Sequence, residues 1–329
     1  MPEPHRVDIS VIVVSWNSKG HLERCLESLT RTPCSRSVEI IVVDNGSADG
    51  SPEMVESRFP QARLIRNREN LGFAKANNQA IRVSRGRYIS LVNSDVEVLP
   101  GCLDKLAEFL DQNPKVGNVG PRVLNPDRTL QSSCRRFPSL WNNFCSAAGL
   151  ATLLRGSRLF CGEHMRYFRY DRTLPVDVLV GCFWMMRREA LESVGPLDEE
   201  FFIYAEDVDW CRRCRQAGWE VVFFPGAEAI HHRAASSAAD PVRFAVLQQE
   251  SVLRYWAKHH GFPARVAIRA ILMFHHLTRC LLAAGPRRTR SAKAGRPPQP
   301  VQANRACLRA LLAGRASYPV RTNEGPSTL

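Results

Sequence analysis

The chain has 329 residues, of which 44% are hydrophobic and 23% are charged, values that are ordinary for a globular protein. They exclude a chain that is disordered throughout, a collagen-like repeat and a small disulfide-rich protein. Residues 251–329 carry 14 basic side chains against the single acid Glu324, so this stretch accounts for the whole formal charge of +13. We therefore expect a neutral globular body with a basic C-terminal appendage that contacts an anionic surface, such as a membrane, or a polyanion.

The eleven cysteines have no regular spacing, and an odd number cannot all pair. Free thiols in a cytosolic protein are the simpler interpretation. Cys211 and Cys214 form one C-x-x-C without the second pair of ligands that zinc needs, so we expect them to pack inside a helix. The N-terminus lacks the basic flank and apolar core of a signal peptide, and no apolar run reaches the roughly 18 residues of a membrane span.

Four apolar runs in the first hundred residues, at 9–14, 39–43, 64–65 and 88–92, are typical of buried strands. Helical patterns alternate with them, one after Ser18 and another at about 73–84. This alternation predicts an open, mainly parallel α/β sheet. Ligands of such sheets bind at the carboxyl ends of the strands. We expect three polar clusters to converge at that edge: Ser15 to Asn17, Asp44 to Ser47, and Asn93 to Asp95.

The second half is less regular. Residues 125–175 are rich in arginine, aromatic and turn residues without periodicity, which predicts a variable loop region. Strands are expected at 176–180 and 220–224, and helices at 188–194 and through Arg213 to Gln216.

From residue 242 we expect a helix to His260, a break at 261–263 and a second helix to about residue 284. The second helix carries its basic side chains on one stripe and is otherwise apolar, which favours an interfacial helix; these side chains are Arg265, Arg269, His276 and Arg279. Residues 286–329 have the composition of a disordered basic tail, with at most one helical turn at 308–312.

Several carboxylates lie where they could act chemically. Asp44 ends the second strand and could bind a ribose or a base, whereas a dinucleotide-binding enzyme would also need a G-x-G-x-x-G after the first strand, which is absent. Asp95 could bind Mg²⁺ or Mn²⁺ that bridges a diphosphate. Glu206, Asp207 and Asp209 open a helix, where acids often act as caps but where one could serve as a base. A nearby histidine of the His231-His232 pair could add an imidazole to the metal.

Taken in order, these motifs resemble the family 2 inverting glycosyltransferases, and within them the bacterial rhamnosyltransferase-like branch. The resemblance covers about residues 8–260 and rests on five segments: Val11 to Asn17, Ile41 to Ser47, Arg66 to Ala74 with Asn77-Asn78, Asn93 to Asp95, and Gly195 to Trp210. It implies an α/β fold of the GT-A type, an open mixed sheet flanked by helices, together with a nucleotide-diphosphate sugar donor and a divalent cation, Mn²⁺ or Mg²⁺.

The same resemblance assigns roles residue by residue. Asp207 matches the catalytic base, with Glu206 and Asp209 in support, while Asp95 and His231 match the metal ligands. A cation such as Arg213 is expected to keep Asp207 ionised. Asn93 stands where the family's metal motif usually has its first acid. The expected donor-binding residues are Ser15, Asn17, Asp44, Asn70, Gly72, Asn78, Asn93 and Arg213.

The resemblance implies a catalytic domain at 1–240, with a nucleotide-sugar half at about 1–120 and an acceptor and base half at 121–240. The sequence pattern adds the C-terminal helices at 241–285, which could lie at a membrane surface, and the tail at 286–329. The expected reaction transfers a sugar, with L-rhamnose from dTDP-rhamnose as the first choice and another dTDP- or UDP-hexose as the alternative. The expected acceptor is a glycan or a lipid-linked cell-envelope intermediate, at the cytoplasmic face of the membrane.

Two other classes of protein remain open. A non-catalytic sugar-nucleotide or glycan-binding protein would keep the same fold. A nucleic-acid-binding protein would use the basic tail, but its body would then be expected to carry basic and aromatic stripes rather than no net charge. We expect no nucleic acid among the partners.

Overall fold

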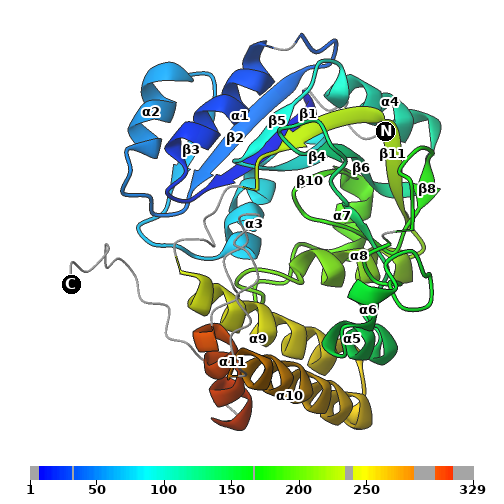
Figure 1. Ribbon diagram of the computed structural model, residues 1–329. Helices are drawn as coiled ribbons and strands as arrows, with labels where there is room; N and C mark the ends of the chain where they lie inside the picture. The colour runs from blue at the N-terminus through cyan, green and yellow to red at the C-terminus, as the bar shows by residue number, and fades with distance from the viewer. Residues whose placement is uncertain (1–6, 32, 166, 234–239, 285–300, 314–329) are drawn as a thin grey trace.

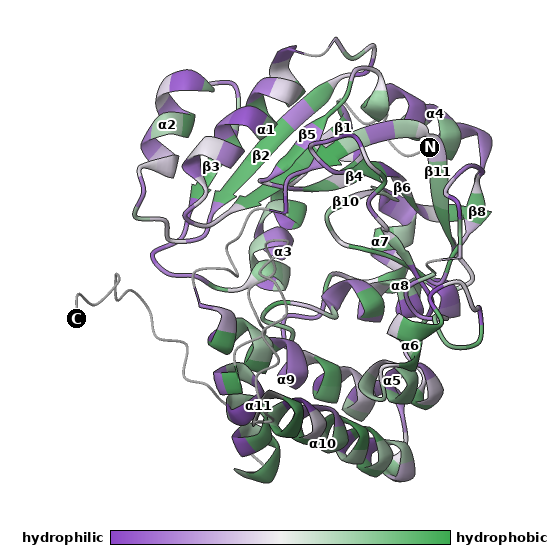
Figure 2. Cartoon of the chain, in the orientation of Figure 1, coloured by the Kyte–Doolittle hydropathy of each residue, from purple (hydrophilic) through white to green (hydrophobic). Residues whose placement is uncertain are grey.

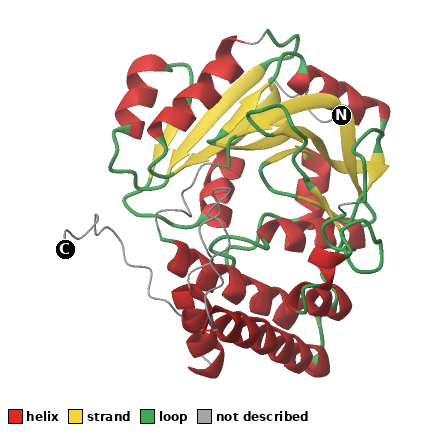
Figure 3. Cartoon of the chain, viewed as in Figure 1, coloured by secondary structure: helices red, strands yellow, loops and turns green. Residues whose placement is uncertain are grey.

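The computed structural model describes residues 7–31, 33–165, 167–233, 240–284 and 301–313. At its centre lies a nine-stranded mixed sheet with helices on both faces (Figures 1 and 3). The strands of this sheet are β1 (Val7–Ser15), β2 (Val38–Asp44), β3 (Arg63–Arg66), β4 (Gly86–Asn93), β5 (Val96–Val98), β6 (Val116–Leu124), β8 (Leu174–Pro175), β10 (Phe183–Arg187) and β11 (Glu220–His231). Their order is β3-β2-β1-β4-β10-β6-β11-β5, with β8 paired to β11, and β7 (Cys134–Arg135) pairs separately with β9 (Val178–Leu179).

The first strands are apolar on both faces because both faces are covered. Val11 and Val13 of β1 pack into a core cluster with Leu22 and Leu26 of the helix that follows, whereas Ile12 faces the second cluster. Helices α1 (Lys19–Arg31), α2 (Ser51–Arg58) and α4 (Cys102–Gln112) contribute to the first cluster. Helices α3 (Phe73–Val83), α7 (Arg188–Val194) and α8 (Glu206–Gln216) contribute to the second.

The parallel core predicted from the sequence is confirmed. Strands β2 and β4 both pair in parallel with β1, and β3 pairs in parallel with β2. Antiparallel pairing enters where β10 inserts between β4 and β6. The last strand is longer than predicted, because β11 passes through Pro225 and Gly226 at a shift in register and continues to His231. Pro and Gly usually end a strand, but an irregularity in the ladder accommodates them here.

The region 125–175 contains two helices that periodicity did not predict, α5 (Leu140–Ala147) and α6 (Leu150–Leu153). All eleven cysteines lie within the described residues and are free, and Cys211 and Cys214 are buried in α8 as expected. The two predicted C-terminal helices are present as α9 (Pro241–His259) and α10 (Phe262–Ala284).

Two expectations for the C-terminal region are wrong. Residues Val301–Ala313 form a full helix, α11, which packs on α9 and α10, rather than a single turn in a disordered tail. The basic stripe of α10 is also interrupted, because His276 is buried and its Nδ1 lies 2.9 Å from Oδ1 of Asn304 in α11. The rest of the expected tail, 286–300 and 314–329, lies outside the described residues. Within the part of the chain that is described, no helix has both the length and the apolar character that crossing a bilayer requires.

Candidate active site

The polar clusters predicted at the strand ends do meet at one edge of the sheet. Ser15 is aligned with Asp44 in the β1–β2 pair, and Val14 is aligned with Asn93 in the β1–β4 pair. Strand β11 brings a fourth group to the same edge, since His231 is aligned with Val96 of β5, directly after Asp95. Topology therefore collects residues from four separate segments of the chain.

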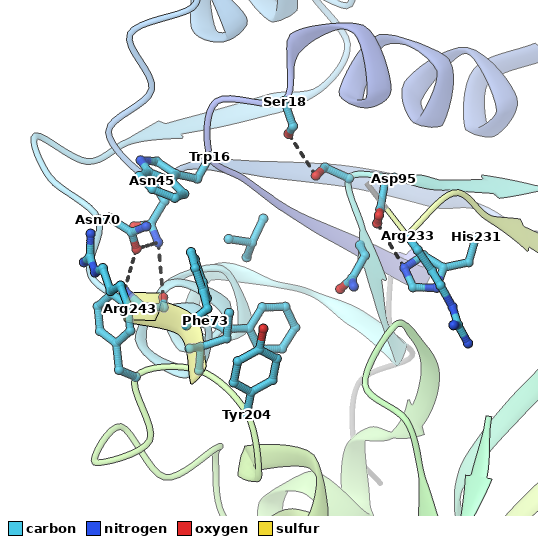
Figure 4. A pocket seen from close by; sticks show the side chains of 17 residues that line it. Trp16, Ser18, Asn45, Asn70, Phe73, Asp95, Tyr204, His231, Arg233 and Arg243 are labelled. Atoms are coloured by element: carbon cyan, nitrogen blue, oxygen red, sulfur yellow. Dashed lines mark hydrogen bonds and ion pairs between the residues drawn. The ribbon is translucent and has the colours of Figure 1, made fainter. Parts of the chain in front are cut away.

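These ends open into a cavity of about 310 Å³, called here the strand-end cavity, and its polar side chains are drawn in Figure 4. Its polar lining comes from the predicted clusters and from segments further along the chain: Ser18, Asn45, Asn70, Asn93, Ser94, Asp95, His231, Arg233 and Arg243. Its apolar lining is aromatic and aliphatic: Val14, Trp16, Phe73, Phe202, Ile203, Tyr204 and Phe244. A polar floor between aromatic walls suits a ligand with a ring and charged groups.

Asp44 is buried near this cavity and only half of its carboxylate is satisfied. Its Oδ2 accepts a hydrogen bond from the backbone N–H of Ser47 at 3.0 Å. Its Oδ1 has no hydrogen-bond partner among the described residues, although Asp44 is only 2% exposed. A buried acceptor without a donor is costly, so this oxygen is suited to a ligand that brings an N–H or O–H group.

The ring of asparagines beside Asp44 is tied together by hydrogen bonds. Asn45 Nδ2 donates to Asn70 Oδ1 at 2.8 Å, and the same oxygen accepts from the backbone N–H of Gly72 at 2.9 Å. Gly72 has a φ of +87°, and a Cβ there would lie 2.5 Å from the carbonyl oxygen of Phe202. Only glycine therefore allows this loop to approach the segment that forms the opposite wall.

Asp95 and His231 form a pair at the edge of the same cavity, visible at the right of Figure 4. Oδ1 of Asp95 lies 3.3 Å from Nε2 of His231. On the far side of the ring, Nδ1 of His231 donates to Oε1 of Gln131 at 2.6 Å, which fixes the ring and aims Nε2 at Asp95. Burial by itself would lower the pKa of His231. The hydrogen bond to Asp95 and the interaction with Cys182 outweigh this effect and raise the pKa to about 10.

His232 is directed elsewhere. Its Nε2 lies 2.6 Å from Oε1 of Glu97, and its ring contacts His21. Of the two adjacent histidines, His231 is therefore the one that faces Asp95 and the cavity.

A second cavity of about 370 Å³, the Asp207 cavity, adjoins the first, and Phe73, Asn93, Ile203, Tyr204 and His231 border both. Its other polar lining residues are Arg135, Asn143, Glu163, Glu206, Asp207 and Gln248. Oδ1 of Asn93 is buried without a hydrogen-bond partner among the described residues. The shared residues thus connect the cavity that contains Asp95 with the cavity that contains Glu206 and Asp207.

Asp207 and Glu206 sit together at the start of α8. Oδ2 of Asp207 accepts from the backbone N–H of Gly181 at 3.1 Å. Burial raises the pKa of Asp207, while the positive charge of Arg135 and the backbone hydrogen bonds oppose that rise. Burial and the neighbouring Asp207 raise the pKa of Glu206 well above its usual value, and its Oε2 has no partner among the described residues. The pair is therefore best described as an ionisable Asp207 beside a neutral Glu206.

The cation beside Asp207 is Arg135, and the expectation of Arg213 in that place is wrong. Arg213 donates to Asp209 at 2.9 Å and to the carbonyl oxygens of Val194 and Pro196, and it lines neither cavity. Arg213 therefore holds α8 against the turn that follows α7.

Asp209 is fully buried and has three cationic or ionisable partners. Besides Arg213, its Oδ1 lies 2.7 Å from Nζ of Lys258 and 2.7 Å from Nε2 of His259. Asp209 is not the helix cap, because the cap position belongs to Ala205. It is instead a buried ion-pair centre that joins α8 to α9.

Two further expected donor-binding residues are engaged in structural bonds. Asn78 is buried and bonds both the N–H and the carbonyl oxygen of Leu197, so it fixes α3 to the loop before α8 and does not line the strand-end cavity. Oδ1 of Asn17 accepts from the backbone N–H of Ala48 at 2.8 Å and ties two loops together. Ser15 is also buried, with its Oγ 2.9 Å from Oγ of Ser18, which does line the cavity.

The sequence interpretation missed several lining residues. Trp16 and Phe73 lie inside two of the segments on which the resemblance rests. An aromatic residue near a strand end does not by itself indicate a binding site, so neither was predicted. Arg233, Arg243 and Tyr204 reach the cavity from β11's end, from α9 and from the loop before α8. Only the tertiary arrangement brings them together.

Comparison with known proteins gives a consistent result. The model of "Glycosyl transferase family 2" matches residues 10–195. The chain is 32% identical over 280 residues to an N-acetylglucosaminyl-diphospho-decaprenol L-rhamnosyltransferase of Mycobacterium tuberculosis, covering 79% of this chain and 88% of the relative. It is 24% identical over 230 residues to the low-salt glycan biosynthesis hexosyltransferase Agl10 of Haloferax volcanii, covering 69% of this chain and 67% of the relative.

Solved structures share the fold. A mannosyltransferase from Pyrobaculum calidifontis, in complex with GDP-Man and Mn²⁺, superposes with a TM-score of 0.54 at 20% identity, covering 95% of this chain and 83% of that one. GalNAc-T7 with UDP, GalNAc and Mn²⁺ superposes with the same TM-score of 0.54 at 16% identity, covering 75% of this chain and 47% of that one. The mixed sheet flanked by helices is thus the GT-A fold that the sequence predicted.

Proposed function

The chain belongs to glycosyl transferase family 2, and from this premise we propose that it transfers L-rhamnose from dTDP-rhamnose to a hydroxyl group of a lipid-linked glycan, with inversion at the anomeric carbon. The glycosyltransferase activity follows from the family, whereas the donor and acceptor are the proposal. The rhamnosyltransferase relative supports this donor, and a UDP-hexose is the second candidate. The observation that carries the proposal is the placement of Asp95–His231 and Asp207 in adjoining cavities that meet at Asn93.

The strand-end cavity suits the donor. The unpartnered Oδ1 of Asp44 can accept from the imide N–H of thymine or uracil or from a ribose hydroxyl. Trp16 and Phe73 offer apolar surface to the rings, and Arg233 and Arg243 offer positive charge to a diphosphate. This division of apolar and basic lining matches the two ends of a nucleoside diphosphate.

A divalent cation fits the donor set at Asp95. One carboxylate and one imidazole are ligands that Mn²⁺ accepts readily, and both side chains are still partly exposed at the cavity. No cluster of three or more His, Cys, Asp or Glu side chains suited to a metal occurs among the described residues, so the remaining ligands would come from the diphosphate and water. When bound, the cation would neutralise charge on the departing diphosphate. Asp95 and His231 would hold it.

Asp207 is the proposed general base. Its carboxylate takes the proton of the acceptor hydroxyl, and the acceptor oxygen forms a bond to the anomeric carbon of the donor sugar. The bond between that carbon and the diphosphate oxygen breaks on the opposite face, and its electron pair leaves with the nucleoside diphosphate. Arg135 favours the ionised form of Asp207 before the proton is taken.

The acceptor is proposed to bind in the Asp207 cavity. This cavity continues, through Arg135, Asn143, Glu163 and Gln248, into a further cavity of about 490 Å³ between α5, α9, α10 and α11. The relative from Mycobacterium tuberculosis is named for an acceptor that carries N-acetylglucosamine on diphospho-decaprenol, and a related lipid-linked saccharide is our proposed acceptor class. Such an acceptor places the reaction at the cytoplasmic face of a membrane.

Calorimetry of the full chain with a panel of nucleotide sugars, with and without Mn²⁺, tests the proposal. We expect dTDP-rhamnose to bind in a Mn²⁺-dependent manner and Asp95→Ala to abolish that dependence while the fold is kept. The exposed Asp127→Ala is the matched control. Equal Mn²⁺-dependent affinity of Asp95→Ala and the wild type would overturn the metal assignment. Binding without any transfer to a lipid-linked saccharide would instead favour a non-catalytic sugar-nucleotide-binding protein.

A further inference from the structure

Helix α10 presents an apolar stripe to solvent. The stripe consists of Phe262, Val266, Phe274, Leu277 and Leu281, with exposed fractions between 43% and 73%, while Leu282, 80% exposed, lies outside it. Successive members of the stripe are three, four or eight residues apart, and these spacings place them on one face of an α-helix. Other parts of the helix surface pack on α9, α11 and α5. In Figure 2 the helix is coloured mostly as hydrophobic along its length.

The α5–α6 segment extends this apolar surface. The ring of Phe144 in α5 stacks on Phe274 of α10 with centroids 6.4 Å apart, and both rings are at least 40% exposed. Trp141 lies 6.0 Å from Phe144 and donates its Nε1–H to the carbonyl oxygen of Leu159 at 2.9 Å. Leu153 and Leu159 are 79% and 60% exposed. We call this continuous surface of α5, α6, the loop to Leu159 and α10 the apolar face.

The charges on the apolar face have one sign. Residues 139–160 and 262–284 contain no Asp or Glu, but they contain five arginines: Arg155, Arg158, Arg265, Arg269 and Arg279. Arg265 and Arg269 are exposed and lie along the border of the apolar stripe. Across α9, α10 and α11 the only acid is Glu250. An acid-free, arginine-bordered apolar surface is complementary to a bilayer with anionic headgroups.

A second copy of the chain suits this surface less well. A two-fold interface would place the apolar face against itself, and so bring its arginines together without acids to pair them. A bilayer instead offers phosphate groups to the arginines and acyl chains to the leucines and aromatic rings. Trp141, with its apolar ring exposed and its N–H already satisfied, suits the headgroup boundary.

We propose that the apolar face docks the protein on an anionic lipid bilayer, with Phe274, Leu281 and Leu153 inserted below the headgroups and Arg265 and Arg269 bound to lipid phosphates. Helices α5 and α10 also line the cavity of about 490 Å³ that continues into the Asp207 cavity. Docking through their outer faces brings this cavity next to the membrane surface. The docking itself does not rest on the proposed function, since it needs neither donor nor acceptor.

Sedimentation of the full chain with vesicles tests this inference. We compare phosphatidylcholine vesicles with vesicles that also contain phosphatidylglycerol, at low and at high salt, without any nucleotide sugar. Two double variants separate the two contributions: Leu153→Gln with Leu281→Gln, and Arg265→Gln with Arg269→Gln. The matched control is Arg31→Gln with Arg82→Gln, whose side chains are 75% and 61% exposed on α1 and α3. Thermal unfolding of each variant checks that the fold is retained.

The wild type and the control should sediment with the anionic vesicles, and high salt should weaken their binding. The arginine variant should lower the partition constant about thirtyfold. The leucine variant should lower it at least as much, because two exposed leucines would no longer be buried in the acyl region. Sedimentation of both variants at wild-type levels would overturn the proposal and point to residues outside the apolar face. Failure of the wild type to sediment, or a dimer that the leucine variant abolishes, would overturn it as well.

Discussion

Glu206 and Asp207 are neighbouring carboxyl groups in a buried site, and two negative charges so close together are unfavourable there. Burial raises the pKa of both, and Asp207 alone has an opposing cation, Arg135. This asymmetry makes Asp207 the base and leaves Glu206 as a neutral neighbour. Raised pKa values of this kind are typical of catalytic acids and bases.

The first prediction concerns the pH dependence of this pair. A base must be deprotonated, so transfer should fall as pH drops through the pKa of Asp207, which lies above the ordinary aspartate value of 3.8. Arg135→Gln removes the cation that lowers this pKa, so the acidic limb of kcat/KM should move to higher pH by roughly one unit. Arg213→Gln is the control, because Arg213 bonds Asp209 instead. A limb that moves in Arg213→Gln and stays in place in Arg135→Gln would contradict the geometry described here.

The second prediction concerns Gln131, which belongs to none of the sequence motifs. Its Oε1 accepts from Nδ1 of His231 and orients the ring toward Asp95. Gln131→Leu removes this acceptor, so the Mn²⁺ concentration needed for half-maximal donor binding should rise about 10- to 100-fold. Calorimetric titration with Mn²⁺ at fixed nucleotide sugar measures it, with the exposed Gln112→Leu as control. An unchanged Mn²⁺ requirement would show that Gln131 has no part in holding His231.

Residues that directly follow apolar strands were predictable, because the strand fixes where they lie. Asp44 ends β2 and Asp95 comes shortly after β4. Asp95 lines the strand-end cavity, and Asp44 is buried beside it. Asn78 and Arg213 belong to motifs that resemble those of the glycosyltransferase family. Both side chains nevertheless contact loops beside their helices rather than the cavity. A motif therefore indicated which segments form the site, while the direction of each side chain depended on packing.

At the end of α9, Lys258 and His259 contribute to a fully buried ion-pair centre, at the opposite end of the helix from Arg243. Asp209 of α8 is their common partner, and Lys258 also bonds Asp198 at 2.6 Å. This centre joins the helix that carries Asp207 to the helix that carries Arg243.

The third prediction tests this link. Asp209→Asn removes the charge and leaves Lys258 and His259 facing a neutral side chain, so the free energy of unfolding should fall by on the order of 3 kcal/mol. Urea unfolding measures it, with the exposed Asp127→Asn as control. Transfer per folded molecule should stay within a few fold of the wild type. Lost transfer without lost stability would mean that Asp209, rather than Asp207, acts as the base.

Helices and strands with a clear pattern of apolar residues were predicted well. Helices that are stabilised mainly by contacts with other parts of the chain were not. The apolar runs of β1, β2 and β4 and the long helices α9 and α10 are clear in the sequence. Helices α5 and α6 lie in a stretch where aromatic and polar residues alternate irregularly, and α11 lies in a basic, proline-flanked segment. The bond between Asn304 and His276 and the packing on α9 supply the stability that local sequence lacks for α11.

The molecule as a whole places the sheet edge with its two cavities opposite the helical layer of α9, α10 and α11 (Figure 1). We retain as a proposal that residues 1–120 supply most of the nucleotide-sugar site, that 121–240 bind the acceptor and supply the base, and that 241–285 contact the membrane. His231, Arg233 and Arg243 add to the donor side from the later segments. The neutral body and the basic C-terminal stretch fit that division. The nucleotide sugar and the lipid-linked acceptor would then enter the site from different sides, and the acceptor would come from the side of the membrane.

The central claim is that Asp207 deprotonates the acceptor during transfer from a nucleotide sugar. Asp207→Asn keeps the size of the side chain but cannot take the proton. The direct measurement is the steady-state rate of transfer from dTDP-rhamnose to polyprenyl-diphospho-N-acetylglucosamine with Mn²⁺, alongside donor dissociation constants. If Asp207 is the base, the rate should fall about 10²- to 10⁴-fold in Asp207→Asn while donor affinity stays nearly unchanged. A wild type that transfers sugar, together with an Asp207→Asn variant that transfers it at the same rate, would contradict the claim.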